Sequence, residues 1–309
     1  VKITNIESDY NLSNYRTIST SAPTYDLWVG GVQVNPANAS DVLGDGTVSF
    51  DGYENSDAGY YVLTLNNANI NSGAVFYDGA YIDAGIYCYL YDDLCLRLVG
   101  DNVINVTGDQ AEYAMGLFAY YSLYVEGDGT LTINVVGSEN NDAAYGINAD
   151  WDYESLYLRS GAVTVNVSGD SPETFGVRAS SVYDTNSGDV AVTATGPEEV
   201  YGLHAPYVYL YSVAECAVTA TYTTETGYHE AYALYNCNGL YDSPVSGTVT
   251  FAGQTQAVMG SFYYFGINTL QMSAYTDLAG TAENKVESPS WSNRADYKTI
   301  VLSPGTKTV

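Results

Sequence analysis

A short unit recurs along this chain at a nearly constant step, and this repeat restricts the possible folds more than any other feature. The unit joins a glycine to a following aliphatic residue, and it is clearest in Tyr145–Ala149. The glycine position of the unit recurs at Gly85, Gly116, Gly146, Gly176 and Gly202 and, as an alanine, at Ala233. The steps lie between 26 residues (176 to 202) and 31 residues (85 to 116). Such self-similarity predicts one supersecondary unit stacked on itself.

Each repeat contains about three short stretches in which apolar and small polar residues alternate. In the repeat that contains Gly146 these stretches are residues 146–149, 155–158 and 162–167. Alternation is typical of half-buried strands, and clusters of Gly, Asp, Asn and Ser separate the stretches. A propeller blade would need four strands over about 40 residues, and leucine-rich repeats would show a fixed Leu/Asn pattern.

The sequence therefore predicts an all-β fold, a right-handed parallel β-helix of about seven coils. One coil cannot bury its own apolar residues, but stacked coils form a continuous core with like residues above like. The inward positions after the glycines should therefore stack along one face. These positions are Leu117, Ile147, Val177 and Leu203.

The chain divides into four expected segments. Residues 1–24 form a polar N-terminal arm, and residues 25–58 a lead-in whose Gly30–Gly31 pair indicates a β-hairpin. Residues 59–272 form the repeat body, and residues 273–309 a C-terminal cap and tail. The ends of a solenoid expose strand edges that must be capped or paired with another chain. Each terminal segment could either fold back on its own body or dock on a neighbouring copy.

The charge of the chain restricts its partners. The formal net charge is −27, which arises from 36 acidic and only 9 basic residues. Between Ile18 and Asn284 the only basic residues are Arg97, Arg159 and Arg178. Nucleic acids and anionic membranes are bound mainly through Lys and Arg, and no apolar run approaches the roughly 20 residues that cross a bilayer. We therefore expect no nucleic-acid partner and no membrane insertion.

Three segments before the repeats, together with the repeat unit itself, carry a family resemblance. The segments are Leu27–Val34, Asp41–Gly46 and Leu63–Ala68. With them the chain resembles pectin-lyase-like β-helix proteins, and most closely the uncharacterised surface proteins of anaerobic Gram-positive bacteria. The resemblance implies an extracellular or cell-surface location and, for some members, carbohydrate binding. The scarcity of trypsin sites also suits a protein exposed to proteases, although compositional drift is an equally simple explanation.

The parts needed for polysaccharide cleavage are not recognisable. Lyases of this type resemble one another in placing an Arg or Lys base beside a calcium ion. Hydrolases of this type combine three Asp residues with a His and an Arg-x-Lys pair. The sequence contains no Arg-x-Lys and only two histidines, His204 and His229. We therefore expect no enzymatic activity.

An acidic cluster is a weak candidate for calcium binding. Asp150, Asp152 and Glu154 alternate as the oxygen ligands of a calcium loop do, but Ser155 stands where the turn glycine is expected. The commoner alternative is a set of solvated loop carboxylates. The four cysteines, which contain no C-x-x-C pair, also leave two alternatives open. Cys216 and Cys237 could form a bridge between coils, or all four thiols could be free and buried.

Tyrosine is the most unusual component, with 32 residues. Two alternating trios are candidates for a glycan-binding surface or a subunit interface: Tyr87, Tyr89, Tyr91 and Tyr207, Tyr209, Tyr211. Outward aromatic rings can stack on sugars, whereas a ladder of rings can also merely shield the coil.

The function expected from the sequence is therefore that of a non-enzymatic extracellular structural or adhesive surface protein. It would be a homo-oligomer or polymer that self-assembles into a filament, sheath or layer. The alternative is a carbohydrate-binding module that holds a neutral or calcium-bridged glycan on its tyrosine-rich face.

Overall fold

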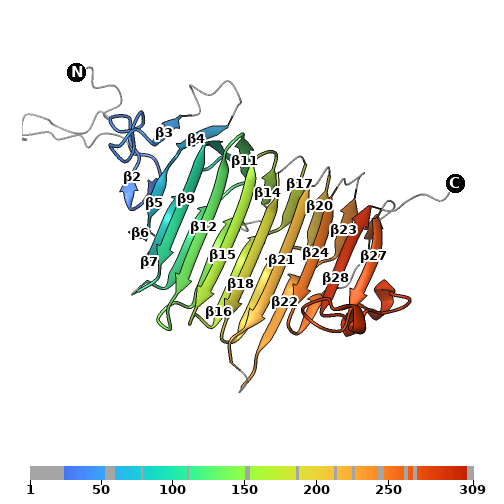
Figure 1. The fold of residues 1–309 in the computed structure, drawn as a ribbon. Helices are drawn as coiled ribbons and strands as arrows, with labels where there is room; N and C mark the ends of the chain where they lie inside the picture. Colours follow the sequence, from blue (N-terminus) through green and yellow to red (C-terminus); the bar gives the residue numbers. More distant parts are fainter. Residues whose placement is uncertain are drawn as a thin grey trace, which may run out of the picture.

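The computed structural model describes residues 24–52, 60–77, 79–109, 111–149, 154–185, 188–211, 214–224, 227–242, 247–260, 264–266 and 270–304. These residues form a β-solenoid whose strands follow one another from the N-terminal to the C-terminal end (Figure 1). Helical structure in the described part is limited to two 3-10 segments near the C-terminus, η3 (Ala282–Asn284) and η4 (Trp291–Asp296). None of the helices in these ranges is long and apolar enough to cross a membrane.

Three parallel sheets, each receiving one strand per coil, build the solenoid. Sheet A contains β7 (Ala80–Cys88), β10 (Tyr113–Ala119), β13 (Ala143–Ala149), β16 (Glu173–Ala179), β19 (Glu199–His204), β22 (Glu230–Tyr235) and β25 (Gln256–Val258). Sheet B contains β4 (Tyr61–Asn66), β8 (Leu94–Val99), β11 (Leu123–Gly127), β14 (Ser155–Leu158), β17 (Ser181–Asp184), β20 (Tyr207–Leu210), β23 (Gly239–Asp242) and β26 (Tyr264–Gly266). Sheet C contains β5 (Asn69–Asn71), β9 (Asp101–Thr107), β12 (Thr130–Gly137), β15 (Ala162–Gly169), β18 (Val190–Gly196), β21 (Glu215–Tyr222) and β24 (Thr248–Gly253).

The predicted fold class is confirmed, but the predicted number of coils is too high by one. Six coils, from β7–β8–β9 to β22–β23–β24, place one strand in each of the three sheets. The next coil supplies β25 and β26 but does not continue sheet C in parallel. There β28 (Thr299–Pro304) pairs antiparallel with β24 and lies between it and β27 (Leu270–Tyr275). The C-terminal strand thus replaces the parallel strand that a seventh coil would need.

The core is a set of stacked rows, as the repeat predicts. Leu117 pairs with Ile147, Ile147 with Val177, and Val177 with Leu203 in adjacent strands of sheet A. All four side chains are buried in the same apolar cluster. The prediction that these residues stack along one inward face is therefore confirmed.

The glycine of the repeat unit marks the closest approach of sheet A to sheet C. A Cβ atom at Gly146 would collide with Cγ1 of Val165 and with the carbonyl oxygen of Gly176 in the next coil. Tyr145 belongs to an aromatic cluster outside the core, whereas Ile147 lies within the core. The glycine therefore sits where the strand changes the face that its side chains present. The same crowding returns at the repeat glycines of four other coils, whereas β22 has Ala233 at this position.

Antiparallel strands cover the N-terminal end. The predicted hairpin is confirmed, because β1 (Leu27–Val29) and β2 (Val32–Gln33) pair through a turn in which Gly30 and Gly31 have φ values of 54° and 78°. Strand β1 and the short β6 (Gly73–Tyr77) both pair antiparallel with β7. Strand β3 (Val48–Asp51) pairs antiparallel with β4. The N-terminal edges of sheets A and B are thereby covered from within the chain.

The C-terminal segment folds back on its own body, which is one of the two alternatives considered for it. Besides the pairing of β28, the guanidinium of Arg294 donates hydrogen bonds to the carbonyl oxygens of Trp291 and Gly260. The N-terminal arm, residues 1–23, lies outside the described residues.

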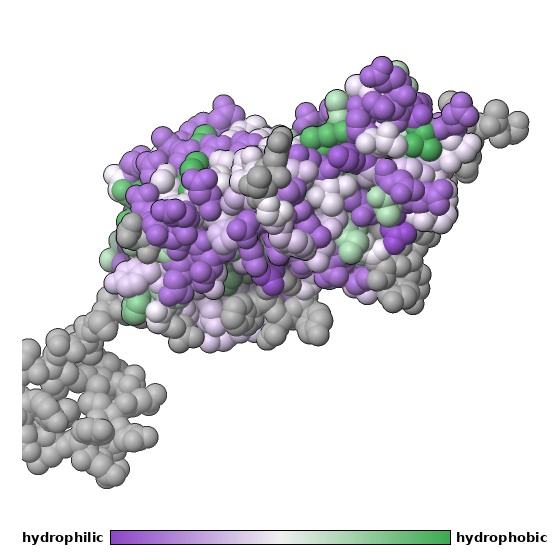
Figure 2. All heavy atoms as spheres, turned by 90° about the horizontal axis from the view of Figure 1, so that it is seen from below, coloured by the Kyte–Doolittle hydropathy of each residue, from purple (hydrophilic) through white to green (hydrophobic). Residues whose placement is uncertain are grey.

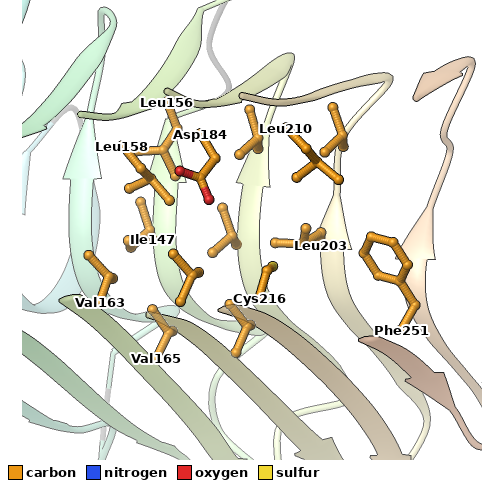
Figure 3. Close-up of a pocket in the computed structure, with 15 residues that line it drawn as sticks. Ile147, Leu156, Leu158, Val163, Val165, Asp184, Leu203, Leu210, Cys216 and Phe251 are labelled. Atoms are coloured by element: carbon orange, nitrogen blue, oxygen red, sulfur yellow. The ribbon is translucent and has the colours of Figure 1, made fainter. Parts of the chain in front are cut away.

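The space between the three sheets is filled mainly by aliphatic side chains (Figure 3). It retains a cavity of about 20 Å³, which is about the room that one water molecule requires. Asp184 carries a carboxyl group into this cavity and is only 2% exposed. Its partners in the neighbouring strands of sheet B are Leu158 and Leu210.

The four cysteines are free and buried, so no bridge joins Cys216 to Cys237. Burial raises the pKa of all four thiols to about 12. At neutral pH each thiol is therefore protonated and packs as a small apolar group, which is the second of the two alternatives left open by the sequence.

Candidate functional site: an aromatic groove on sheet A

The outer face of sheet A carries two rows of side chains, one before and one after the repeat glycine. From β10 to β22 the row before the glycine contains Met115, Tyr145, Phe175, Tyr201 and Tyr232. From β7 to β22 the row after the glycine contains Tyr87, Phe118, Asn148, Arg178, His204 and Tyr235. Both rows are in register from coil to coil, so each side chain has its counterparts directly above and below it.

Each row contains a stack of rings, but the two stacks occupy different coils. In the first row the ring centroids of Tyr145 and Phe175 lie 4.8 Å apart with an interplanar angle of 9°. In the second row Tyr87 and Phe118 lie 4.7 Å apart at 16°. The second stack ends at Phe118, because the next residue in its row is Asn148. The first stack begins at Tyr145, which follows Met115. Between β10 and β13, the terminal ring of each stack therefore has a non-aromatic neighbour on one side.

A groove of about 360 Å³ lies at this junction. That volume is within the range of small-molecule sites, and the walls are mostly aromatic. The residues that line the groove are Tyr77, Ala80, Ile82, Tyr87, Tyr89, Tyr113, Met115, Phe118, Tyr145, Asn148 and Arg178. Tyr77 comes from β6, so the short strand that pairs antiparallel with β7 also forms part of the wall.

Besides the tyrosine hydroxyl groups, two residues, Asn148 and Arg178, bring polar groups to the groove. Arg178 donates a hydrogen bond from Nη1 to the hydroxyl oxygen of Tyr145 at 3.5 Å, and its guanidinium carbon lies 5.7 Å from the ring centroid of Phe175. Asn148 offers both a donor and acceptors on one short side chain. The groove thus combines ring faces with a small set of convergent hydrogen-bonding groups.

The tyrosines of the groove are neutral at physiological pH. Burial raises the pKa of Tyr145, and burial together with the neighbouring Tyr120 raises the pKa of Tyr89 to about 12. Their hydroxyl groups therefore remain able to donate hydrogen bonds. A row of carboxyl groups, Glu173, Glu199 and Glu230, occupies one register position near the start of β16, β19 and β22. Burial and the charge of Glu199 raise the pKa of Glu173.

The outer face of sheet B carries a different aromatic arrangement, a continuous stack. One register position is tyrosine in each of five successive coils: Tyr124, Tyr157, Tyr183, Tyr209 and Tyr241. Neighbouring ring centroids lie 4.4 to 4.7 Å apart with interplanar angles of 2° to 9°. Every ring inside this stack has both faces covered by other rings, so it presents mainly its edge and hydroxyl group outward.

Arg159 and the ring of Tyr60 cover the N-terminal end of the tyrosine stack. The guanidinium carbon of Arg159 lies 4.1 Å from the ring centroid of Tyr124. Glu126 forms ion pairs with Arg97 at 3.3 Å and with Arg159 at 3.9 Å. Both arginine side chains are more than 40% exposed, so these ion pairs contribute little to stability.

The six tyrosines singled out from the sequence do not form one site. Tyr87 and Tyr89 line the groove, whereas Tyr91 is 69% exposed and contacts Tyr89 edge-on. The second trio belongs to the other face, because Tyr209 is part of the stack on sheet B. Tyr207 lies on the same strand, β20, and the ring of Tyr211 lies 6.0 Å from that of Tyr209.

The other groove residues were not singled out from the sequence, although a signal for them exists. Tyr145, Asn148 and Phe118 all flank repeat glycines, and Arg178 is one of only three arginines in the repeat body. Aligning the repeats on the glycine would have placed Phe118, Asn148 and Arg178 in one column. The change from ring to amide to guanidinium along that column is the signal of the groove.

The calcium candidate is only partly described. Asp150 and Asp152 lie outside the described residues. Glu154 accepts a hydrogen bond from the hydroxyl of Ser122 at 2.7 Å. Within the ranges that the structure describes, no group of three or more His, Cys, Asp or Glu side chains could hold a metal ion.

Known proteins give no guide to the ligand of the groove. Comparisons of the chain with protein-family models, with curated proteins and with solved structures found no match. The occupant must therefore be inferred from the chemistry of the groove and of its surroundings. Seen from below, the molecule shows strongly hydrophobic residues only in small separate patches (Figure 2).

Proposed function

We propose that this protein is a non-enzymatic, carbohydrate-binding β-solenoid that acts as an adhesive protein at an extracellular surface. The observation that carries the proposal is the groove on sheet A, where two ring stacks end beside Asn148 and Arg178. A continuous stack has no free ring face to offer. At the junction of the two offset stacks, Phe118 and Tyr145 each lack a ring neighbour on one side of their row and line the groove, where 4% and 5% of their side chains are exposed.

A sugar ring matches the two kinds of surface in this groove. Its C–H groups form an apolar face that can pack on an aromatic ring, and its hydroxyl groups form a polar edge. Phe118 and Tyr145 would supply the ring faces. Asn148 and Arg178 would supply donors and an acceptor for the hydroxyl groups.

The charge of the protein favours a neutral glycan. A formal charge of −27 repels long polyanions, and Glu173, Glu199 and Glu230 lie on the same sheet as the groove. A neutral oligosaccharide avoids this repulsion. The absence of a recognisable acid–base set in the sequence favours retention of the glycan over its cleavage.

End-to-end assembly into a filament is a second candidate function. The distribution of basic residues favours it, since Lys2, Arg16, Lys285, Arg294, Lys298 and Lys307 lie near the two ends of an otherwise acidic chain. The C-terminal segment, however, is engaged with its own body through β28 and Arg294. Such a filament would therefore depend on residues 1–23.

The binding proposal can be tested on an array of neutral oligosaccharides with the full chain and two variants. Phe118→Ala removes a terminal ring of the groove, and Tyr183→Ala removes an internal ring of the stack on sheet B as a matched control. We expect the wild type and Tyr183→Ala to bind the same glycans and Phe118→Ala to lose them. Absence of binding by the wild type, or equal loss in both variants, would overturn the proposal.

A further inference from the structure

The outer face of sheet C differs from the other two outer faces. Its central part consists of three rows at the register positions of Thr132, Asn134 and Val136. From β9 to β21, every position in these rows is Asn, Thr, Ser, Ala or Val. Carboxylates stand at the rim, at Asp101 and Glu215. A chain of charge −27 thus has one face whose centre is uncharged and free of aromatic rings.

The polar side chains of this face are bonded to one another along the solenoid. The amide of Asn134 donates to Asn105 at 3.0 Å, and the amide of Asn166 donates to Asn134 at 3.0 Å. The hydroxyl groups of Thr195 and Thr221 lie 3.0 Å apart. These polar groups already form hydrogen bonds within the face. A second copy could therefore cover the face and displace its water while these hydrogen bonds remain.

The face is regular enough to receive an identical face. Its strands lie side by side across the front of the molecule (Figure 1). Small side chains repeated in register, asparagine ladders among them, are the pattern of parallel sheets that pack face to face at a spacing of about 10 Å. The five strands from β9 to β21, about 4.8 Å apart and about six residues long, give roughly 500 Å² per copy, or about 1,000 Å² in a pair, which reaches the lower limit for a specific interface.

Charge also favours a second copy of the chain at this face. Two acidic copies repel each other wherever carboxylates meet, so an uncharged centre is where they can approach most closely. We propose that two copies of this protein pair face to face through sheet C, about a two-fold axis. The pair would leave the sheet A groove of each copy outside the interface. Two grooves on one particle would then bind a multivalent surface with avidity.

The pairing can be tested with the full chain by sedimentation velocity over a wide range of concentrations. Thr193→Glu places a carboxylate near the centre of the face, where Thr193 is exposed between Asn166 and Thr219. Ser181→Glu makes the same change in charge on the outer face of sheet B. We expect a monomer–dimer equilibrium for the wild type and for Ser181→Glu, and dimerisation weaker by about tenfold or more for Thr193→Glu.

Salt supplies a second readout. Screening of the acidic rims should strengthen the wild-type dimer as salt concentration rises, whereas a dimer held by ion pairs would weaken. Circular dichroism melting shows whether each variant is folded. A wild type that remains monomeric at high salt, equal loss of pairing in both variants, or open-ended assemblies would overturn the proposal. Binding of monomeric wild type to a flat insoluble polysaccharide that Thr193→Glu abolishes would also overturn it, in favour of a ligand face.

Discussion

The outer faces of sheets A and B are both rich in aromatic residues, yet the two faces arrange their rings differently. On sheet B one register position is tyrosine in five successive coils, and each internal ring is covered on both sides by its neighbours. On sheet A the corresponding column changes from Phe118 to Asn148 and Arg178, and the ring stack stops. A continuous column of rings covers the faces of its inner rings, whereas the interrupted column lines the groove in which we propose that a ligand binds.

The difference follows from single positions rather than from overall composition. Both faces are made by the same repeat, at the same spacing between coils, and both contain tyrosine. In a parallel solenoid each outward residue meets its counterparts in the next coils, so one substitution ends a stack. The groove of about 360 Å³ appears where two such interruptions meet.

The largest loss of stability is expected for a change in the core beneath both faces. Ile147→Ala should lower the free energy of unfolding by about 2–5 kcal/mol, because it removes buried methyl groups and leaves a cavity. Ile147 is fully buried between Leu117 and Val177, and urea unfolding measures the change. As a control, Val99→Ala, at a side chain that is 45% exposed, should change the free energy by about 0.5 kcal/mol or less. Equal effects of the two changes would contradict the stacked core.

Alkaline pH should weaken both aromatic faces together. Burial raises the pKa of Tyr89, which directly follows β7 of sheet A, and of Tyr124 and Tyr209 on sheet B, from the ordinary value of 10 to about 12. The folded state thus favours the neutral form. Its contribution to stability is fully present below pH 10 and is lost as pH rises through about 12.

Urea unfolding at increasing pH, together with the ultraviolet absorbance of tyrosinate, measures this loss. The wild type should keep a constant stability up to the ordinary tyrosine pKa and then unfold as the buried tyrosines ionise. Ionisation of all tyrosines at the ordinary pKa, with the fold intact, would show that neither face shields its rings.

The two faces should separate when single rings are removed. Tyr183→Ala deletes two stacked contacts, with Tyr157 at 4.7 Å and Tyr209 at 4.4 Å. Since an aromatic pair contributes about 0.5–1.5 kcal/mol, we expect a loss of about 1–3 kcal/mol in the free energy of unfolding. Glycan binding should not change. A Tyr183→Ala protein that is as stable as the wild type but binds more weakly would reverse the roles assigned to the two faces.

The sequence predicted those features that repeat in every coil. The three-strand coil, the inward row from Leu117 to Leu203 and the turn at Gly30–Gly31 all follow from local pattern, and the structure contains them. The number of coils was not predictable, because β28 enters sheet C from a tail without any periodic pattern.

The groove was predicted only in part, because ring stacking depends on residues about 30 positions apart. Alternation placed Tyr87 and Tyr89 on one face but could not show which sheet that face belongs to. Alternation likewise could not show that Tyr209 would lie on a different sheet. Asn148 and Arg178 acquire their significance only from the register that places them after Phe118.

Calorimetric titration of a neutral oligosaccharide into the full chain, Phe118→Ala and Tyr183→Ala tests most directly whether the interrupted face is the binding face. We predict binding to the wild type and to Tyr183→Ala with equal affinity, and binding at least about tenfold weaker to Phe118→Ala, which loses a ring face. Circular dichroism should show all three proteins folded. Unchanged affinity in Phe118→Ala, with affinity lost in Tyr183→Ala, would contradict the account.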